Sequence, residues 1–195
     1  MQQLIEDEIS RQRDKTATNV IGYFHQNIFR YFPNCVVPRE GWDVIVTQKD
    51  GTKIYVEMKN KHNTMNAASS QKTYIQMQNQ IMQTPDDFCF LVEAIAPCSR
   101  NIPWGCSVNK THCEHAHIRR VSMDQFYAIV TGEATAFFEM CMQLPKTIEK
   151  IVRKNSNLTV QKDTVLEELQ QMHPDLQIAL YQLAFATYDG FSLLK

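Results

Sequence analysis

The stretch that decides the fold is residues 42–60, which read WDVIVTQKDGTKIYVEMKN. Two runs rich in β-branched and aromatic residues, 42–48 and 52–60, flank the turn-forming segment 49–51, which reads KDG. Two such runs joined by a short turn containing glycine are typical of a β-hairpin. We therefore predict two antiparallel strands here and build the remaining expectations around them.

The second strand of this hairpin has one apolar and one polar face. Side chains alternate between the two faces of a strand, so Glu57 and Lys59 share one face. Ile54, Val56 and Met58 fall on the other face, and we expect them to join the hydrophobic core.

The length of the turn decides where Asp43 points. A two-residue turn would pair Asp43 with Met58 and direct its side chain away from Glu57. A three-residue loop, with Gly51 in the left-handed conformation, would instead place Asp43 directly opposite Glu57. Residues that lie opposite each other on one face approach within roughly 4.5–5.5 Å at Cβ. The Asp-Gly order is compatible with both turns, and we predict the three-residue loop.

Asp43, Glu57 and Lys59 then form a candidate catalytic site for phosphodiester hydrolysis. Two carboxylates this close repel each other unless a cation lies between them. Oxygen ligands with incomplete protein coordination favour Mg²⁺, with Asp43 and Glu57 as its ligands. Lys59 can orient the attacking water and offset charge in the transition state. The bare pattern is weak evidence, because a solvated hairpin face with alternating charges has the same sequence.

The segment after the hairpin is polar and rich in side chains that contact DNA. Residues 60–72 read NKHNTMNAASSQK, and Asn, Lys and Ser are residue types that contact bases and phosphates. An ordinary polar connection with Asn caps is an equally good interpretation. The candidate DNA-binding residues in this segment are Lys61, His62, Asn63, Asn66, Ser69, Ser70 and Lys72.

Periodicity around the hairpin predicts one α/β domain over residues 1–195, with a small mixed β-sheet flanked by helices and extra C-terminal helices. The catalytic core spans about 19–96 and the C-terminal helical part about 122–195, while 97–118 is expected to be irregular. The expected elements are helices 3–14 and 19–31, an extended segment 35–37, helix 70–83, strand 88–96, helices 122–130 and 133–153 (the latter interrupted at Pro145), and tail helices 162–172 and 175–187.

Bulk composition excludes few classes of protein. The chain has a formal net charge of −1, 44% hydrophobic and 21% charged residues, which is ordinary for a globular protein. A neutral average neither indicates nor excludes a nucleic-acid partner. The polar, acidic N-terminus is unlike a signal peptide, and no apolar run could cross a bilayer. We therefore expect a cytoplasmic protein, not in a membrane, with its six cysteines reduced.

Two further groups of residues lie between 97 and 120. Cysteines and histidines in segment 98–117 are zinc-type ligands, but no Cys-x-x-Cys pair is present and the spacings fit no compact zinc motif. We expect a loop without zinc. Arg119 and Arg120 follow and make the region locally basic, so they are candidate DNA-binding residues, with a solvated loop as the alternative.

Several longer runs resemble one family, the PD-(D/E)XK nucleases. Within that superfamily they resemble more narrowly the type II restriction endonucleases that recognise GGNCC. The resemblance covers nearly the whole chain and is far more specific than a Glu-x-Lys signature. The runs that carry it are GWDV (41–44), IYVEMKNKHNTMN (54–66), IGYFHQNIF (21–29), NIPW (101–104), IRRVS (118–122) and LAFATYDGF (183–191).

The resemblance implies a restriction-endonuclease-like sandwich. Asp43 and Glu57 match the superfamily's metal ligands, and Lys59 matches its catalytic lysine. Many members add a polar group from a helix ahead of the hairpin. Here the supporting residue could be Glu8, His25 or Gln26, although the last two could simply satisfy a core helix.

The same resemblance implies a site-specific enzyme that cuts double-stranded DNA with Mg²⁺ at a palindrome. Two-fold symmetric targets imply a homodimer, and the system would include a cognate DNA methyltransferase. The resemblance also implies that relatives carry more residues ahead of the position of Glu6. Two alternatives remain: a structure-specific repair or recombination nuclease with the same core, and a non-catalytic DNA-binding protein. Against the second, a carboxylate pair without a metal would repel DNA.

Overall fold

The hairpin belongs to a six-stranded sheet in the computed structural model of the chain. The structure describes residues 23–154, 171–185 and 187–191. These fall into two compact units. The first unit comprises Met1–Ala96 and Arg100–Ser122, and the second comprises Pro97–Ser99 and Met123–Lys195.

The sheet of the first unit is mixed, with strand order β1-β2-β3-β4-β8-β5. Strand β3 pairs in parallel with β4, and β4 in parallel with β8, whereas the other neighbours are antiparallel. The predicted α/β architecture with a mixed sheet is confirmed. Its strands are β1 (Cys35–Val36), β2 (Val44–Thr47), β3 (Lys53–Lys61), β4 (Phe88–Ile95), β5 (Asn101–Pro103) and β8 (Ile118–Ser122).

The hairpin between β2 and β3 has the predicted three-residue loop. Gly51 has a φ of +90°, in the left-handed region where glycine is favoured, and the Gln48 N–H donates to the Thr52 carbonyl at 2.8 Å. Val44 pairs with Val56 in the register of the two strands. One residue further out, Asp43 therefore lies opposite Glu57.

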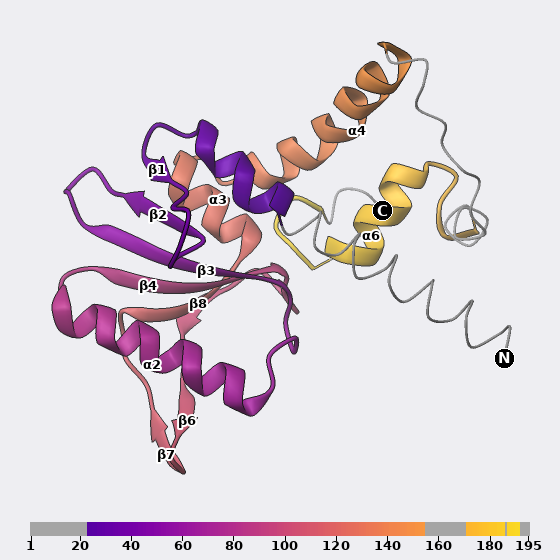
Figure 1. Cartoon of the computed structure of the whole chain (residues 1–195). Helices are drawn as coiled ribbons and strands as arrows, with labels where there is room; N and C mark the ends of the chain where they lie inside the picture. Colours follow the sequence, from indigo (N-terminus) through magenta and orange to yellow (C-terminus); the bar gives the residue numbers. More distant parts are fainter. Residues whose placement is uncertain (1–22, 155–170, 186, 192–195) are drawn as a thin grey trace, which may run out of the picture. The chain divides into compact units, whose positions relative to one another are not determined.

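Helix α2 (Ala67–Gln83) connects β3 to β4 and covers one face of the sheet (Figure 1). Its buried residues Tyr74 and Met77 pack in one cluster with Leu91 and Ile118. The helix starts three residues before the predicted position 70, because the Asn66 side chain accepts a hydrogen bond from the Ser69 N–H at 2.8 Å and caps it.

The chain ahead of the sheet is helical as predicted, with residues 23–28 in a helix that continues into the 3₁₀ turn η1 (Phe29–Tyr31). Phe29 is fully buried. The expected helix 3–14 lies outside the described residues.

The expectation of an irregular segment over 97–118 is wrong. Strand β5 pairs with β8, and β6 (Cys106–Val108) forms a second hairpin with β7 (Thr111–Cys113). Strands β5, β6 and β7 have three residues each, too few for an alternating pattern to be recognised. Asn109 and Lys110 form the turn of that hairpin with φ values of 49° and 68°.

The second unit is helical, with α3 (Met123–Thr131), α4 (Ala136–Lys154) and α6 (Leu176–Phe185). These confirm the expected helices 122–130 and 175–187. Of the expected helix 162–172, only the last two residues are described, and they are helical. An aromatic cluster packs within this unit, comprising Phe137, Phe138, Tyr181, Phe185, Tyr188 and Phe191.

The predicted interruption at Pro145 is also wrong, because α4 runs through it. Proline lacks an N–H, so the Cys141 carbonyl, four residues earlier, loses its donor within the helix. The Tyr181 hydroxyl donates to that carbonyl instead. This bond satisfies the carbonyl that the proline leaves without its helical partner.

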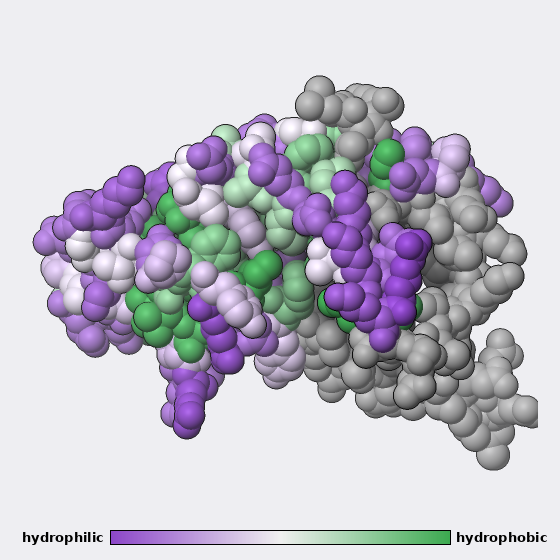
Figure 2. Space-filling view, turned by 90° about the horizontal axis from the view of Figure 1, so that it is seen from above, coloured by the Kyte–Doolittle hydropathy of each residue, from purple (hydrophilic) through white to green (hydrophobic). Residues whose placement is uncertain are grey.

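On the face seen in Figure 2, hydrophobic residues show as patches between hydrophilic ones. No helix among the described residues is long and apolar enough to cross a membrane.

Replacing Gly51 by Ala tests the loop that sets the hairpin register. No atom lies within 4 Å of the position of an added Cβ, so the cost is conformational. We expect Gly51→Ala to lower the free energy of unfolding by about 1 kcal/mol, measured by urea denaturation. Gly51→Asn should be milder, because Asn tolerates positive φ. An alanine variant as stable as the original would contradict the loop geometry.

Tyr181→Phe removes the donor to the Cys141 carbonyl. We expect a loss of about 1–2 kcal/mol in the free energy of unfolding, measured by chemical denaturation. In a Pro145→Ala background the helix regains its own donor, so the same change should cost less. Equal losses in the two backgrounds would contradict this account of Pro145.

Candidate active site

Asp43 is anchored to β3 on both sides of Glu57. Its N–H donates to the Val56 carbonyl at 3.0 Å. Its carboxylate oxygen Oδ2 accepts a hydrogen bond from the Met58 N–H at 2.7 Å. Backbone and side chain thus hold the Asp43 carboxyl group against the strand that carries the other two candidate catalytic residues.

Glu57 and Lys59 lie two residues apart on β3 and form an ion pair. The Lys59 ammonium Nζ lies 2.7 Å from the Glu57 oxygen Oε1. The Lys59 side chain is 30% exposed and the Glu57 side chain 21%, so both are accessible to a ligand while partly shielded from water. The structure therefore brings Asp43, Glu57 and Lys59 together.

The electrostatics of this group favour a bound cation. Burial raises the pKa of Asp43 above its ordinary value, and the nearby charge of Glu57 raises it further. The Met58 N–H and the Lys59 ammonium act in the opposite direction and lower that pKa. A divalent cation between the two carboxylates would relieve their repulsion and stabilise the ionised form of Asp43.

The donor set fits Mg²⁺ with incomplete protein coordination. Asp43 and Glu57 provide carboxylate oxygens, which Mg²⁺ prefers, and Mg²⁺ commonly keeps several waters or binds phosphate oxygens. Across residues 23–154, 171–185 and 187–191, no group of three or more His, Cys, Asp or Glu side chains could hold a metal ion. The cysteine- and histidine-rich segment 98–117 lies within these residues. All six cysteines are free thiols.

A cavity of about 460 Å³ opens beside these residues, and we name it the catalytic cavity. Glu57 and Lys59 of β3 line one side of it. Two of the predicted DNA-binding residues, Ser69 and Lys72, line it from the first turns of α2. The remaining lining residues are Gly41, Thr64, Met65, Thr73 and Gln76.

The other candidate DNA-binding residues of segment 60–72 divide into two kinds. Lys61, Asn63 and Ser70 line a second cavity, described below. His62 is tied to the end of β4, because its N–H donates to the Ile95 carbonyl at 3.0 Å. Asn66 is exposed, but its side-chain oxygen caps α2. The interpretation of this segment as a polar connection therefore accounts for Asn66 and His62.

Of the three supporting candidates, Gln26 contacts the site. Its side-chain Nε2 donates to the Asp43 carbonyl at 3.3 Å. His25 is largely buried, its Nδ1 has no hydrogen-bond partner in the part of the chain that is described, and burial lowers its pKa to about 4. Glu8 lies outside the described residues.

Arg119 and Arg120 point to opposite faces of β8 and have different surroundings. Arg119 donates to the side chain and carbonyl of Asn101 and to the Ala116 carbonyl. Arg120 lines the second cavity and pairs with Glu93, which is 1% exposed. Glu93 is not among the site residues predicted from the sequence. A carboxylate within the apolar run 88–96 was the available signal, because a buried charge requires a partner.

Comparison with known proteins finds one matching protein family, and the match includes the candidate catalytic residues. A family model described as Eco47II restriction endonuclease matches residues 1–153, a range that contains Asp43, Glu57 and Lys59. The type II restriction enzyme Sau96I of Staphylococcus aureus is 32% identical over 164 residues, covering 77% of this chain and 62% of the relative. The type II restriction enzyme Eco47II of Escherichia coli is 29% identical over 161 residues, which cover 74% of this chain and 64% of the relative. The chain thus spans less than two thirds of the length of either relative. No solved structure matches it.

The raised pKa of Asp43 gives a test of the carboxylate pair. Without divalent metal, we expect Asp43 to titrate above 3.8, its ordinary value, and to titrate lower in Glu57→Gln, where one cause of the rise is removed. The folded protein then holds this proton more tightly than the unfolded chain, so the stability it contributes is lost as pH rises through the folded pKa. Carboxyl ¹³C NMR measures both values.

Asp50 provides the control, because its hydrogen bonds to Thr52 lower its pKa and it lies at the other end of the hairpin. Its titration should be the same in both proteins. An Asp43 pKa that is unchanged in Glu57→Gln would contradict the proximity of the two carboxylates.

Proposed function

This chain belongs to the Eco47II restriction endonuclease family, and we propose that it is a site-specific endonuclease that hydrolyses both strands of double-stranded DNA with Mg²⁺. The observation that carries the proposal is the grouping of Asp43, Glu57 and Lys59 on one strand pair beside an open cavity. The matching relatives are named as type II restriction enzymes, which supports the same activity.

Asp43 and Glu57 would hold the metal. When bound, Mg²⁺ supplies Lewis-acid polarisation of the phosphoryl group and acidifies water. The Met58 N–H fixes one oxygen of the Asp43 carboxylate and so orients the group towards Glu57. Gln26 would have a positioning role, since it holds the Asp43 backbone.

Lys59 would act on the nucleophile and on the reacting phosphate. Its ammonium group, now paired with Glu57, can orient the attacking water and offset negative charge on the transition state. The water oxygen attacks phosphorus and the bond from phosphorus to the 3′ oxygen breaks. The attacking water loses a proton, the leaving 3′ oxygen takes one up, and the products are a 5′-phosphate and a 3′-hydroxyl.

The finer assignments rest on the resemblance of the sequence runs. Asp43, followed after thirteen residues by Glu57-Met-Lys59, matches the PD-(D/E)XK pattern, and the narrower resemblance assigns a GGNCC-type palindrome. A palindromic target favours a homodimer, because protein symmetry mirrors the symmetry of the site. A cognate methyltransferase would protect the host DNA, with both enzymes acting in the cytoplasm.

Cleavage of plasmid DNA that contains GGNCC sites tests this function. With Mg²⁺, we expect discrete fragments whose rate of formation falls at least about 10²-fold in Glu57→Ala and in Lys59→Ala. Lys53→Ala is the matched control, since Lys53 is exposed on the same strand, and it should cut at the original rate.

Other outcomes would identify the alternative functions. Cutting of branched DNA alone would indicate a structure-specific nuclease. Binding of DNA without cutting would indicate a non-catalytic protein. An intact plasmid, or equal cleavage by the Glu57 and Lys59 variants, would contradict the proposed active site.

A further inference from the structure

A buried carboxylate links two arginines next to the catalytic cavity. Glu93 lies on β4, and its register partner on β3 is Lys59. It is 1% exposed and forms ion pairs with Arg120 of β8 and with Arg100. Two guanidinium groups share one carboxylate, so this cluster carries a formal surplus of one positive charge.

The cluster also has more hydrogen-bond donors than acceptors. Glu93 receives hydrogen bonds from Nε and Nη2 of Arg120 and from Nη2 of Arg100. The Nε of Arg100 is buried and finds no acceptor in the part of the chain that is described. Arg120, unlike Arg100, lines a cavity next to this cluster, and a guanidinium with donors beyond those bound to Glu93 suits an anionic ligand.

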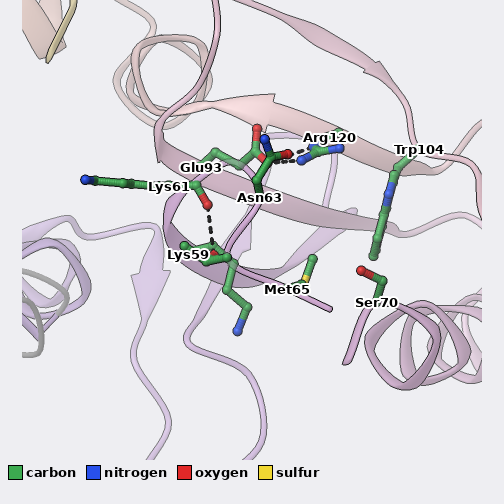
Figure 3. A pocket seen from close by; sticks show the side chains of 9 residues that line it. Lys59, Lys61, Asn63, Met65, Ser70, Glu93, Trp104 and Arg120 are labelled. Atoms are coloured by element: carbon green, nitrogen blue, oxygen red, sulfur yellow. Dashed lines mark hydrogen bonds and ion pairs between the residues drawn. The ribbon is translucent and has the colours of Figure 1, made fainter. Parts of the chain in front are cut away.

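Arg120 faces a cavity of about 180 Å³, which we name the second cavity. Figure 3 shows Glu93 and Arg120 joined on one side, Trp104 and Ser70 facing each other on another, and Lys61 turned away from the ion pair. Lys59, Thr64 and Met65 line both this cavity and the catalytic cavity. The two cavities therefore adjoin along these residues.

We propose that the second cavity binds a phosphodiester group of the DNA strand being cut, next to the group that is hydrolysed. Arg120 contacts this phosphate, and Glu93 is the positioning residue that holds Arg120 in place. The inference rests on the proposed endonuclease function. When the reacting phosphate of a DNA strand lies beside Glu57 and Lys59 in the catalytic cavity, the strand would continue past the residues that line both cavities and enter the second cavity.

The pairing with Glu93 explains why Arg120 suits this role. A carboxylate that binds one edge of the guanidinium fixes the group, so less side-chain entropy is lost when its remaining donors bind a phosphate. Arg119, its neighbour in sequence, lies on the other face of β8 and is bound to Asn101 and Ala116. The two arginines therefore form a matched pair for a test.

The salt dependence of DNA binding tests the phosphate contact. We would measure the affinity for a GGNCC duplex by fluorescence anisotropy across a range of KCl, with Ca²⁺ in place of Mg²⁺ to prevent cutting. Arg120→Gln should weaken binding about tenfold near 0.1 M salt and reduce the slope of log affinity against log salt by about 0.9. Arg119→Gln should keep the original slope.

Neutral methylphosphonates, placed one at a time along the cut strand, locate the contact. One position should weaken binding by the original protein and make no difference to Arg120→Gln. Glu93→Gln should abolish the response to that methylphosphonate as Arg120→Gln does, and combining the two changes should have no further effect at that position. A purely structural role for Glu93 would change thermal stability without this shared effect. If Glu93→Gln does not fold, the Arg120 comparison still decides the proposal.

Two results would overturn the proposal and leave the endonuclease function standing. One is DNA binding by Arg120→Gln with the original salt slope and the original response to every methylphosphonate. The other is an altered sequence preference with an unchanged slope, which would make Arg120 a base-reading residue. If the original protein neither binds nor cuts the duplex, the endonuclease function fails and this proposal fails with it.

Discussion

The hydrogen bond from the Met58 N–H to the Asp43 carboxylate is the contact on which the site depends. It connects the residue ahead of β2 to the strand that carries Glu57 and Lys59. The bond requires the register set by the three-residue loop at Gly51. A shift of one residue would direct Asp43 to the other face of the sheet, because strand side chains alternate.

Charge is concentrated on one face of the sheet, towards the ends of its parallel strands. Glu57 and Lys59 on β3, Glu93 on β4 and Arg120 on β8 all lie on the face that α2 covers. Earlier in the same strands this face is apolar. Each of these four charged groups has a partner of opposite sign, which limits the cost of partial burial. Asp43, on the same face, accepts a hydrogen bond from the Met58 N–H, and burial raises its pKa.

Local sequence patterns were sufficient to predict the hairpin and helix α2. Alternation along β3 and the Lys-Asp-Gly turn predict a hairpin but allow two registers, of which the structure has the one with the three-residue loop. The run 88–96 predicted β4. The short strands β5, β6 and β7 could not be predicted, because three residues contain no usable period. Helix α4 continues through Pro145 because Tyr181, distant in sequence, satisfies the free carbonyl.

For the candidate site, too, only a part could be predicted from the sequence. The grouping of Asp43, Glu57 and Lys59 could be predicted because one hairpin contains all three. Arg119 and Arg120 have different surroundings because they occupy opposite faces of β8. This difference could not be predicted, because strand β8 was not predicted from the sequence. Glu93 was missed because its importance comes from Arg100 and Arg120, which approach it only in the folded sheet.

The most direct test of the central claim is the binding of Mn²⁺, a divalent substitute for Mg²⁺, measured by electron paramagnetic resonance. We expect a saturable site for which Mg²⁺ competes, and which is lost in both Asp43→Asn and Glu57→Gln. Retention of that site in either variant would contradict the assignment of these two carboxylates as a shared metal site.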